Sequence, residues 1–278
     1  MSALTIGLST CPNDTFLFHG LFSGQVDTRG LELAFELADV EELNRRLAAG
    51  RYDVAKGSFH AALLATDELC VLPVGAALGF GVGPLLLAAS DASARAPEPR
   101  VLCPGAHTTA TLLYHLFHAG RGRVEQVVFS EIMPALRAGR AELGVCIHEG
   151  RFTYAAQGLT LVEDLGERWE RSTGAPLPLG GLLARKSLGA GTLRTLSAVL
   201  ADSLAYGHAH RAETAATMAR HAQELAEEVL FQHVDLYVNA WTAELGPAGR
   251  AALATLDARA RAAGLLPRER APLEVCGA

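Results

Sequence analysis

The sequence predicts an α/β protein built from two similar lobes, with a ligand-binding cleft between them. The first observation is a repeated helix–strand phrase, which reads LAAGRYDVA at residues 47–55 and LRAGRAELG at residues 136–144. The second is a pair of matching strand ends, because Cys11-Pro12 and Cys103-Pro104 each close an apolar strand just before a helix. A glycine that ends a helix before a strand is common in α/β proteins, and the phrase alone fits coincidence equally well. The two observations together favour related lobes, and ligands bind in clefts.

Length and composition allow one large domain or two of medium size, since the chain has 278 residues and is 50% hydrophobic. The net charge of −6 and the scattered arginines argue against nucleic acid as a partner. No apolar stretch reaches the roughly 18 residues that a membrane span needs. The amino terminus enters a strand at once without a basic region, so we expect no secretory signal and a cytoplasmic location. Whether the chain is a monomer or a homodimer is open.

The cysteines and histidines indicate no metal site. Five cysteines stand at positions 11, 70, 103, 146 and 276, and no C-x-x-C motif occurs. This spacing favours free buried thiols in a reducing compartment over a zinc site or a disulfide framework. The histidines also lack the spacing to carboxylates that metal ligands show. We therefore expect neither a metal nor another cofactor.

Apolar periodicity and capping residues predict the elements of the larger lobe. Asn13 or Asp14 can cap the first helix, and Asp39 can cap the second, which ends at Ala48. Strands that alternate with helices indicate mostly parallel sheets. In order, the expected elements are strand 3–9, helix 15–23, strand 31–37, helix 39–48, strand 53–55, helix 59–66 and strand 69–74.

Two glycine-rich segments that lead into leucines predict the connections between the lobes. Residues 79–84 superficially resemble a dinucleotide loop, but they enter the strand 85–89, whereas that fingerprint must open a helix. Residues 180–185 have the same design. We interpret both segments as crossing strands, with residues 98–180 in the smaller lobe and residues 1–97 plus 181–278 in the larger.

The smaller lobe repeats the alternation, and the chain becomes helical after Gly189. Prolines mark the entrance to this lobe at Pro97 and Pro99 and the exit at Pro176 and Pro178. The carboxy-terminal helices are expected to cover the larger lobe. The expected elements are strand 100–102, helix 108–119, strand 124–129, helix 131–138, strands 143–147 and 159–164, and helices 193–208, 212–221, 225–236 and 247–263.

Polar residues follow four strand ends, two from each lobe, at 10–14, 56–58, 105–109 and 148–151. Ligands gather at the carboxyl ends of parallel strands, where helix N-termini present free N–H groups. We therefore predict that an anion binds near Ser58 and Thr109. The alternative is that the same residues are an ordinary turn and an ordinary helix cap.

His148 is the candidate catalytic residue, because it ends a strand at the predicted cleft. An unperturbed pKa near ~6.5 suits proton abstraction near neutrality. Glu149 or a backbone carbonyl can fix its tautomer. The alternative is a structural histidine that holds the loop. Tyr237 can also reach the cleft, although packing on the core is the better interpretation.

Seven motifs resemble those of the 1,4-dihydroxy-6-naphthoate synthases of the futalosine route to menaquinone. They span nearly the whole chain in the right order, and the first and fourth are specific to the family. This sequence departs from the usual pattern at Thr10, Gly57 and Gly150, where we expect Pro, a larger apolar residue and Ser. The motifs are STCPNDTF (9–16), GPLL (83–86), HTTA (107–110), IHEGRFTY (147–154), PLGG (178–181), HAQE (221–224) and YVN (237–239).

The resemblance implies a periplasmic-binding-protein-like fold of class II, with central mixed sheets, flanking helices and an interlobe cleft, in a protein that is not secreted. It implies a carbon–carbon lyase that converts cyclic dehypoxanthinyl futalosine, a small-molecule carboxylate, to 1,4-dihydroxy-6-naphthoate without metal or cofactor. Carried over by motif, His148 is the expected proton acceptor. The expected substrate contacts are Lys56, Gly57, Ser58, Thr109, Ala110 and Asn44.

Two other functions stay open. A chorismate dehydratase of the same pathway shares the fold, and the IHEGRFTY phrase favours the synthase over it. A plain solute-binding protein for small anions is the alternative from a different class. The neighbouring genes and a turnover assay discriminate among the three.

Overall fold

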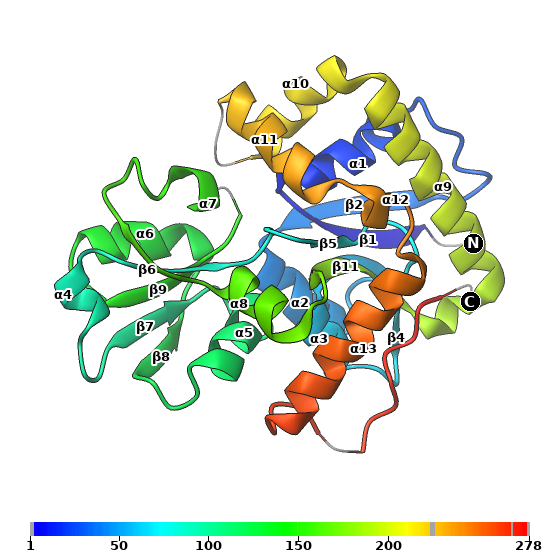
Figure 1. Cartoon of the computed structure of the whole chain (residues 1–278). Coiled ribbons are helices and arrows are strands. Elements are labelled where there is room, and N and C mark those ends of the chain that lie inside the picture. Colours follow the sequence, from blue (N-terminus) through cyan, green and yellow to red (C-terminus); the bar gives the residue numbers. More distant parts are fainter. Residues whose placement is uncertain (1–2, 149, 223–225, 268, 277–278) are drawn as a thin grey trace.

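Two separate β-sheets form the cores of two lobes (Figure 1). The computed structural model describes residues 3–148, 150–222, 226–267 and 269–276. The larger sheet contains β1 (Leu4–Ser9), β2 (Leu33–Ala38), β3 (Val54–Ser58), β4 (Leu69–Val71), β5 (Ala77–Gly79) and β11 (Leu177–Arg185). The smaller sheet contains β6 (Leu85–Ala88), β7 (Arg100–Cys103), β8 (Arg123–Gln126), β9 (Leu143–Cys146) and β10 (Thr160–Asp164). The predicted class, α/β with two mixed sheets, is confirmed.

The two lobes share one strand arrangement. The larger sheet runs β2-β1-β3-β11-β4, with β5 also paired to β11, and the smaller runs β10-β6-β9-β7-β8. In each lobe the first strand pairs in parallel with the second and third, as β1 does with β2 and β3, and β7 with β8 and β9. The third strand then pairs antiparallel with a strand that arrives from the other lobe. The repeated phrases occupy the same place in the two lobes.

Helices flank both sheets, and the carboxy-terminal ones return to the larger lobe (Figure 1). Those of the larger lobe are α1 (Pro12–Phe22), α2 (Val40–Ala48), α3 (Phe59–Leu63), α9 (Gly189–Ala209), α10 (Arg211–His221), α11 (Glu227–Tyr237), α12 (Ala240–Ala243) and α13 (Gly246–Ala262), with a 3-10 turn at Lys186–Leu188. Those of the smaller lobe are α4 (Asp91–Ala94), α5 (Thr109–Phe117), α6 (Phe129–Arg137), α7 (Gly150–Thr153) and α8 (Leu165–Thr173).

Local signals explain where several helices begin. Asp39 caps α2 as predicted, because its side chain accepts a hydrogen bond from the N–H of Glu41. The predicted caps of α1 are wrong, since Pro12 starts that helix and leaves Asn13 and Asp14 inside its first turn. Helix α8 was not predicted, although Asp164 caps it through two backbone N–H groups. The capping residue Asp164 is also the last residue of β10, so the sequence pattern at this point indicates a strand and does not reveal the helix that follows.

Two boundaries differ from the sequence interpretation. Strand β6 hydrogen-bonds within the smaller sheet, so the sheets divide near residue 85, not at residue 98. Strand β3 continues through Ser58, because Lys56–Ser58 pair with residues 180–182 of β11. The segment Lys56-Gly57-Ser58 is therefore the end of a strand and not a turn.

Close backbone approach explains two glycines at the crossing between lobes. A Cβ added to Gly83 would lie 2.2 Å from the Cα of Gly166, and one added to Gly166 would lie 2.5 Å from the Cα of Gly83. These distances are far below van der Waals contact, and backbone atoms cannot move aside as a side chain can. The contact joins the segment that enters β6 to the first turn of α8.

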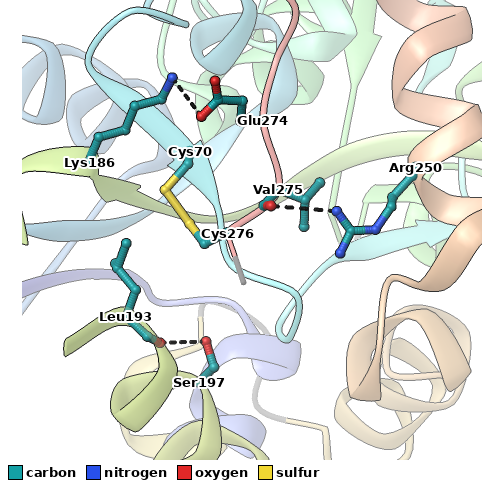
Figure 2. The surroundings of a disulfide bond; sticks show 8 residues. All are labelled: Cys70, Lys186, Leu193, Ser197, Arg250, Glu274, Val275 and Cys276. Carbon is teal, nitrogen blue, oxygen red and sulfur yellow. Dashed lines mark hydrogen bonds and ion pairs between the residues drawn. A yellow bond between two sulfur atoms is a disulfide. The ribbon is translucent and has the colours of Figure 1, made fainter. Parts of the chain in front are cut away.

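One disulfide contradicts the expectation that all cysteines are free. Cys70 on β4 is bonded to Cys276 near the carboxy terminus, with the Cα atoms 5.8 Å apart, whereas Cys11, Cys103 and Cys146 are buried and form no disulfide. Figure 2 shows the bond together with the neighbouring ion pair of Lys186 and Glu274. The two cysteines are 206 residues apart in the sequence. Their pairing comes from the tertiary fold and leaves no local spacing signal in the sequence.

Backbone hydrogen bonds secure the same carboxy-terminal segment to the larger sheet. The N–H of Val71 donates to the carbonyl of Glu274, and the N–H of Cys276 donates to the carbonyl of Val71.

No described helix is long and apolar enough to cross a membrane. The described part of the chain also contains no group of three or more His, Cys, Asp or Glu side chains placed to hold a metal ion.

Removing the disulfide should lower the stability of the protein without altering its cavity. A cross-link that closes so long a loop contributes about 3–5 kcal/mol by restricting the unfolded chain. We expect Cys276→Ser to lower the free energy of unfolding by about this amount, measured by denaturant titration under non-reducing conditions. The control is Lys186→Ala, which removes only a partly exposed ion pair and should cost less than about 1 kcal/mol. Equal stability of Cys276→Ser and the parent chain would contradict the assignment.

Candidate active site

A cavity of roughly 730 Å³, open solvent at its mouth included, lies where the two lobes meet. All four of the polar strand ends contribute to its wall, so their predicted convergence is confirmed. The lining residues from these ends, with the adjoining Ser9 and Ala110, are Ser9, Cys11, Asn13, Asp14, Lys56, Gly57, Ser58, Thr108, Thr109, Ala110, His148 and Arg151. Each lobe thus contributes polar residues from the ends of two of its strands.

Six of the seven predicted site residues line this cavity. They are Lys56, Gly57, Ser58, Thr109, Ala110 and His148. Asn44 is buried on α2 and is not among the described lining residues. Its Oδ1 accepts a hydrogen bond from the N–H of Ser58 at 2.9 Å, and its Nδ2 donates to the hydroxyl of Ser58 at 3.3 Å. Asn44 therefore fixes a residue of the wall, and its direct contact with a ligand stays a prediction.

The first turn of α5 offers donors for an anion. Thr108 caps the helix, since its hydroxyl accepts from the N–H of Thr111. The N–H groups of Thr109 and Ala110 have no partner among the described hydrogen bonds, and both residues line the cavity. Free N–H groups and the helix dipole together favour a negative charge at this point.

The hydroxyl of Thr109 serves the fold rather than the cavity. It donates to the carbonyl of Leu179 at 2.6 Å and accepts from the N–H of His60 at 3.3 Å. These bonds tie α5 to β11 and to the start of α3. The backbone N–H of Thr109 is thus the group that remains for a ligand.

A buried ion pair forms the floor of the larger-lobe side. The ammonium of Lys56 pairs with Oδ1 of Asp14, and both side chains are almost fully buried. Oδ2 of Asp14 accepts from the hydroxyl of Ser9, and Oδ1 also accepts from Nδ2 of Asn13 at 2.9 Å. Buried charges are tolerated when they are paired and hydrogen-bonded in this way.

His148 lies on the smaller-lobe side in a left-handed backbone conformation, with φ of 55°. Histidine is among the residues that tolerate this region, although such conformations are uncommon and concentrate at functional sites. The ring packs edge-on against Phe129 at 4.6 Å between centroids. Its Nδ1 lies 3.0 Å from the Sγ of Cys11, which belongs to the other lobe. Glu149, the predicted partner, lies outside the described residues.

Burial lowers the pKa of His148 to about 4. Loss of hydration is the largest cause, the negative Asp14 opposes it, and the positive Lys56 adds to it. The imidazole is therefore neutral near pH 7 and can accept a proton. Asp14 favours the cation that forms when it does so.

Two further residues of α11 reach the cavity, and sequence reasoning missed one of them. Tyr237 lines the wall, as the sequence allowed, and it also packs in the hydrophobic core, which was the preferred interpretation. His233 lies one helical turn earlier, also lines the wall, and is 2% exposed. The spacing of four residues puts both on one face of the helix, which is the signal that indicates His233 once Tyr237 is placed.

The missing side chain at Gly57 does not leave a hole. A Cβ at Gly57 would meet Cδ1 of Leu183 at 2.7 Å, so the leucine of β11 already occupies that space. At Gly150 a Cβ would meet Cε of Met133 at 3.4 Å, an ordinary contact distance. At these two of the three departures from the family pattern, neighbouring side chains thus occupy the space next to the glycine.

Comparison with solved structures identifies the class. A protein from Archaeoglobus fulgidus superposes with a TM-score of 0.90 at 31% identity, covering 95% of this chain and 98% of that one. A Candida albicans protein described as having the generic periplasmic-binding-protein fold gives a TM-score of 0.68 at 10% identity, covering 97% and 92%. The chain therefore has the periplasmic-binding-protein fold, as the two-lobed arrangement also indicates.

Within that fold the chain belongs to the menaquinone biosynthesis family, whose model matches residues 4–262. A relative from Thermus thermophilus is 45% identical over 275 residues, covering 99% of this chain and all of the relative. One from Streptomyces coelicolor is 41% identical over 270 residues, covering 95% of both. Both relatives are named 1,4-dihydroxy-6-naphthoate synthase.

The neutral state of His148 can be measured directly. We expect its ring to titrate near pH 4, well below ~6.5, because burial disfavours the imidazolium. NMR titration of the ring protons, with the signal assigned by comparison with His148→Gln, checks this. His210, which follows α9 and has a partly exposed side chain paired with Glu213, provides a second histidine signal in the same sample. A His148 midpoint near 6.5 would show that the ring is hydrated.

The anion site can be tested by removing one N–H group. Ala110→Pro deletes the amide donor of Ala110 but is compatible with the first turn of a helix. We expect it to weaken binding of 1-naphthoate, a simple aromatic carboxylate, about tenfold in calorimetry, the scale of one hydrogen bond to a charge. Ala110→Gly keeps the N–H and should bind within about threefold of the parent chain. Equal affinities of the proline and glycine variants would exclude this donor.

Proposed function

We propose that this chain is an enzyme that converts cyclic dehypoxanthinyl futalosine to 1,4-dihydroxy-6-naphthoate in menaquinone biosynthesis. The observation that carries the proposal is the cavity itself, whose walls bring together a neutral histidine, the N-terminus of α5 and a buried ion pair. The full-length likeness to two proteins named for this synthesis supports the same function. The reaction class is that of a carbon–carbon lyase.

The substrate carries a carboxylate on its aromatic half and hydroxyls on its sugar-derived half. The carboxylate binds at the first turn of α5, where the N–H groups of Thr109 and Ala110 have no other described partner. The hydroxyl of Ser58 accepts from Asn44, which leaves its own hydrogen to donate to the substrate. Lys56 acts on the ligand through its charge, since its ammonium already pairs with Asp14.

His148 is the proton acceptor of the proposed reaction. Its neutral ring takes a proton from the substrate beside the junction of the two halves. The proton comes from a hydroxyl of the sugar-derived half, whose oxygen becomes a carbonyl of the departing sugar-derived fragment as the carbon–carbon bond breaks. The electron pair of that bond passes to the aromatic half, which becomes the aromatic naphthoate after it takes up a proton. The imidazolium that results is stabilised by Asp14, the one negative group among the causes that set the pKa of His148.

Contacts across the cleft hold the lobes around the substrate. The Nδ1 of His107 lies 2.6 Å from Oε1 of Glu41, and the N–H of His107 donates to Oε2 of the same carboxylate. Together with the contact between Cys11 and His148, these bonds join the two walls. A closed cleft excludes water and fixes the position of the base.

Turnover by the purified protein tests the proposal. Incubation with cyclic dehypoxanthinyl futalosine should release 1,4-dihydroxy-6-naphthoate, detected by chromatography and mass. Incubation with chorismate tests the dehydratase alternative in the same format. If the protein bound one of these compounds tightly but released it chemically unchanged, and converted neither of them, it would instead be a solute-binding protein. The proposed site of action is the cytoplasm, which thiol trapping of Cys70 and Cys276 in intact cells and cell fractionation can examine.

Replacing His148 should abolish most of the turnover and leave the fold intact. We expect His148→Ala and His148→Gln each to lower kcat by about a hundredfold or more, because neither can take the proton. The substrate should still bind, since its proposed carboxylate contacts lie on α5. His115→Gln is the matched control, because this histidine of α5 is not among the described lining residues.

His148→Gly separates the chemical role from backbone strain. Glycine adopts positive φ freely, so this variant should be at least as stable as His148→Ala in thermal melting while equally inactive. Near-normal turnover in any folded variant of His148 would refute its role as base. Asp14 would then be the next residue to test.

A further inference from the structure

His233 is a buried histidine of the cavity wall that the proposed chemistry does not yet use. It projects from α11 of the larger lobe, is 2% exposed and lines the cavity. Its ring lies 4.5 Å from that of Tyr237 and 6.4 Å from that of Phe152, centroid to centroid. The two aromatic rings restrict the orientation of the imidazole from two sides.

The hydrogen-bond network fixes which nitrogen of His233 carries the hydrogen. Nδ2 of Asn13 donates to the carboxylate of Asp14, so the amide oxygen of Asn13 is turned toward His233. That oxygen can only accept, and it lies 2.9 Å from Nε2 of His233. Reversing the amide would set its oxygen against the carboxylate of Asp14. Nε2 therefore donates, and Nδ1 of the neutral ring bears a lone pair.

Nδ1 of His233 is buried and has no hydrogen-bond partner among the described residues. The ring is held neutral, because burial lowers its pKa well below 6.5, and the positive charge of Lys56, together with that of His148 whenever His148 is protonated, lowers the pKa further. A neutral Nδ1 with a lone pair accepts hydrogen bonds and repels anions. An acceptor without a partner in a buried wall is unfavourable until a ligand supplies a donor.

We propose that Nδ1 of His233 accepts a hydrogen bond from a hydroxyl of the sugar-derived half of the substrate. The inference rests on the proposed function and adds a substrate-binding residue to it. The carboxylate cannot occupy this position, because it has no hydrogen to give. The hydroxyls of the other half are donors, and the aromatic half is already directed to α5 by its charge. The Asp14–Asn13–His233 chain thus makes one wall of the cavity selective for a hydroxyl.

Two substitutions of His233 separate the two ring nitrogens. Glutamine places its amide near the former Nε2, so His233→Gln keeps the contact with Asn13 and loses the acceptor at Nδ1. Asparagine places its amide near the former Nδ1, so His233→Asn can keep the acceptor. We expect His233→Gln to raise KM for the cyclic substrate about tenfold with kcat within about threefold, the scale of one buried hydrogen bond. His233→Asn should raise KM by about threefold or less.

Deoxy analogues of the substrate provide the decisive comparison. For the parent enzyme, one analogue that lacks a single sugar-derived hydroxyl should show a KM raised about tenfold, and for His233→Gln the same removal should change KM less than about twofold. If His233→Gln acted only through a general structural defect, the free-energy cost of the substitution and that of removing the hydroxyl would simply add. Additive losses for every analogue, or parent-like KM for folded His233→Gln, would overturn the inference while the parent enzyme still turns over.

Direct observation of the ring covers the case in which a His233 variant does not fold. In the His148→Gln protein the substrate should stay intact, and the 15N signal of His233 Nδ1 should shift toward that of a hydrogen-bonded acceptor when substrate is added. An unshifted signal at saturation would overturn the inference. Absence of turnover by the parent enzyme would instead overturn the proposed function, and this inference with it.

Discussion

Strand β11 leaves the smaller lobe and enters the centre of the larger sheet, where residues 180–184 pair antiparallel with residues 54–58 of β3. Strand β6 makes the reciprocal crossing and pairs with β9. Because the third strand of each lobe is held by a strand from the other, both carboxyl ends that carry Ser58 and His148 point to the same cleft. The contact of Gly83 with Gly166 sits at this crossing and tolerates no side chain. The position of the cavity depends on these pairings.

The polar wall of the larger lobe depends on one ion pair in turn. Lys56 neutralises Asp14, whose carboxylate accepts hydrogen bonds from Ser9 and Asn13. The amide oxygen of Asn13 is thereby turned toward Nε2 of His233 and accepts its hydrogen. Removing one partner of such a buried pair costs about 3–5 kcal/mol, because it leaves an uncompensated charge. The same two charges act in opposite senses on the pKa of His148, and burial, the largest cause, keeps the neutral form dominant.

The sequence predicted those features that are written in local patterns. Repeated phrases gave the two lobes, the alternation of strands and helices gave the sheets, and strand ends followed by capping residues gave four segments of the cavity wall. Features that depend on distant parts of the chain were missed. The pairing of Cys70 with Cys276 and the entry of β6 into the smaller sheet depend on tertiary contacts. His233 reaches the wall only because α11 returns from beyond residue 226 to cover α1.

The crossing of the strands also determines when each lobe can be finished during synthesis. The strands of the smaller sheet are contiguous in sequence, from Leu85 to Asp164, so that sheet can pair fully as soon as this segment has left the ribosome. The larger sheet must wait for residue 185, although five of its strands are made before residue 80. Until then β3 and β4 expose open edges, which are prone to pair with other chains. The amino-terminal part of the larger sheet therefore keeps unpaired edges longer during synthesis than any strand of the smaller sheet does.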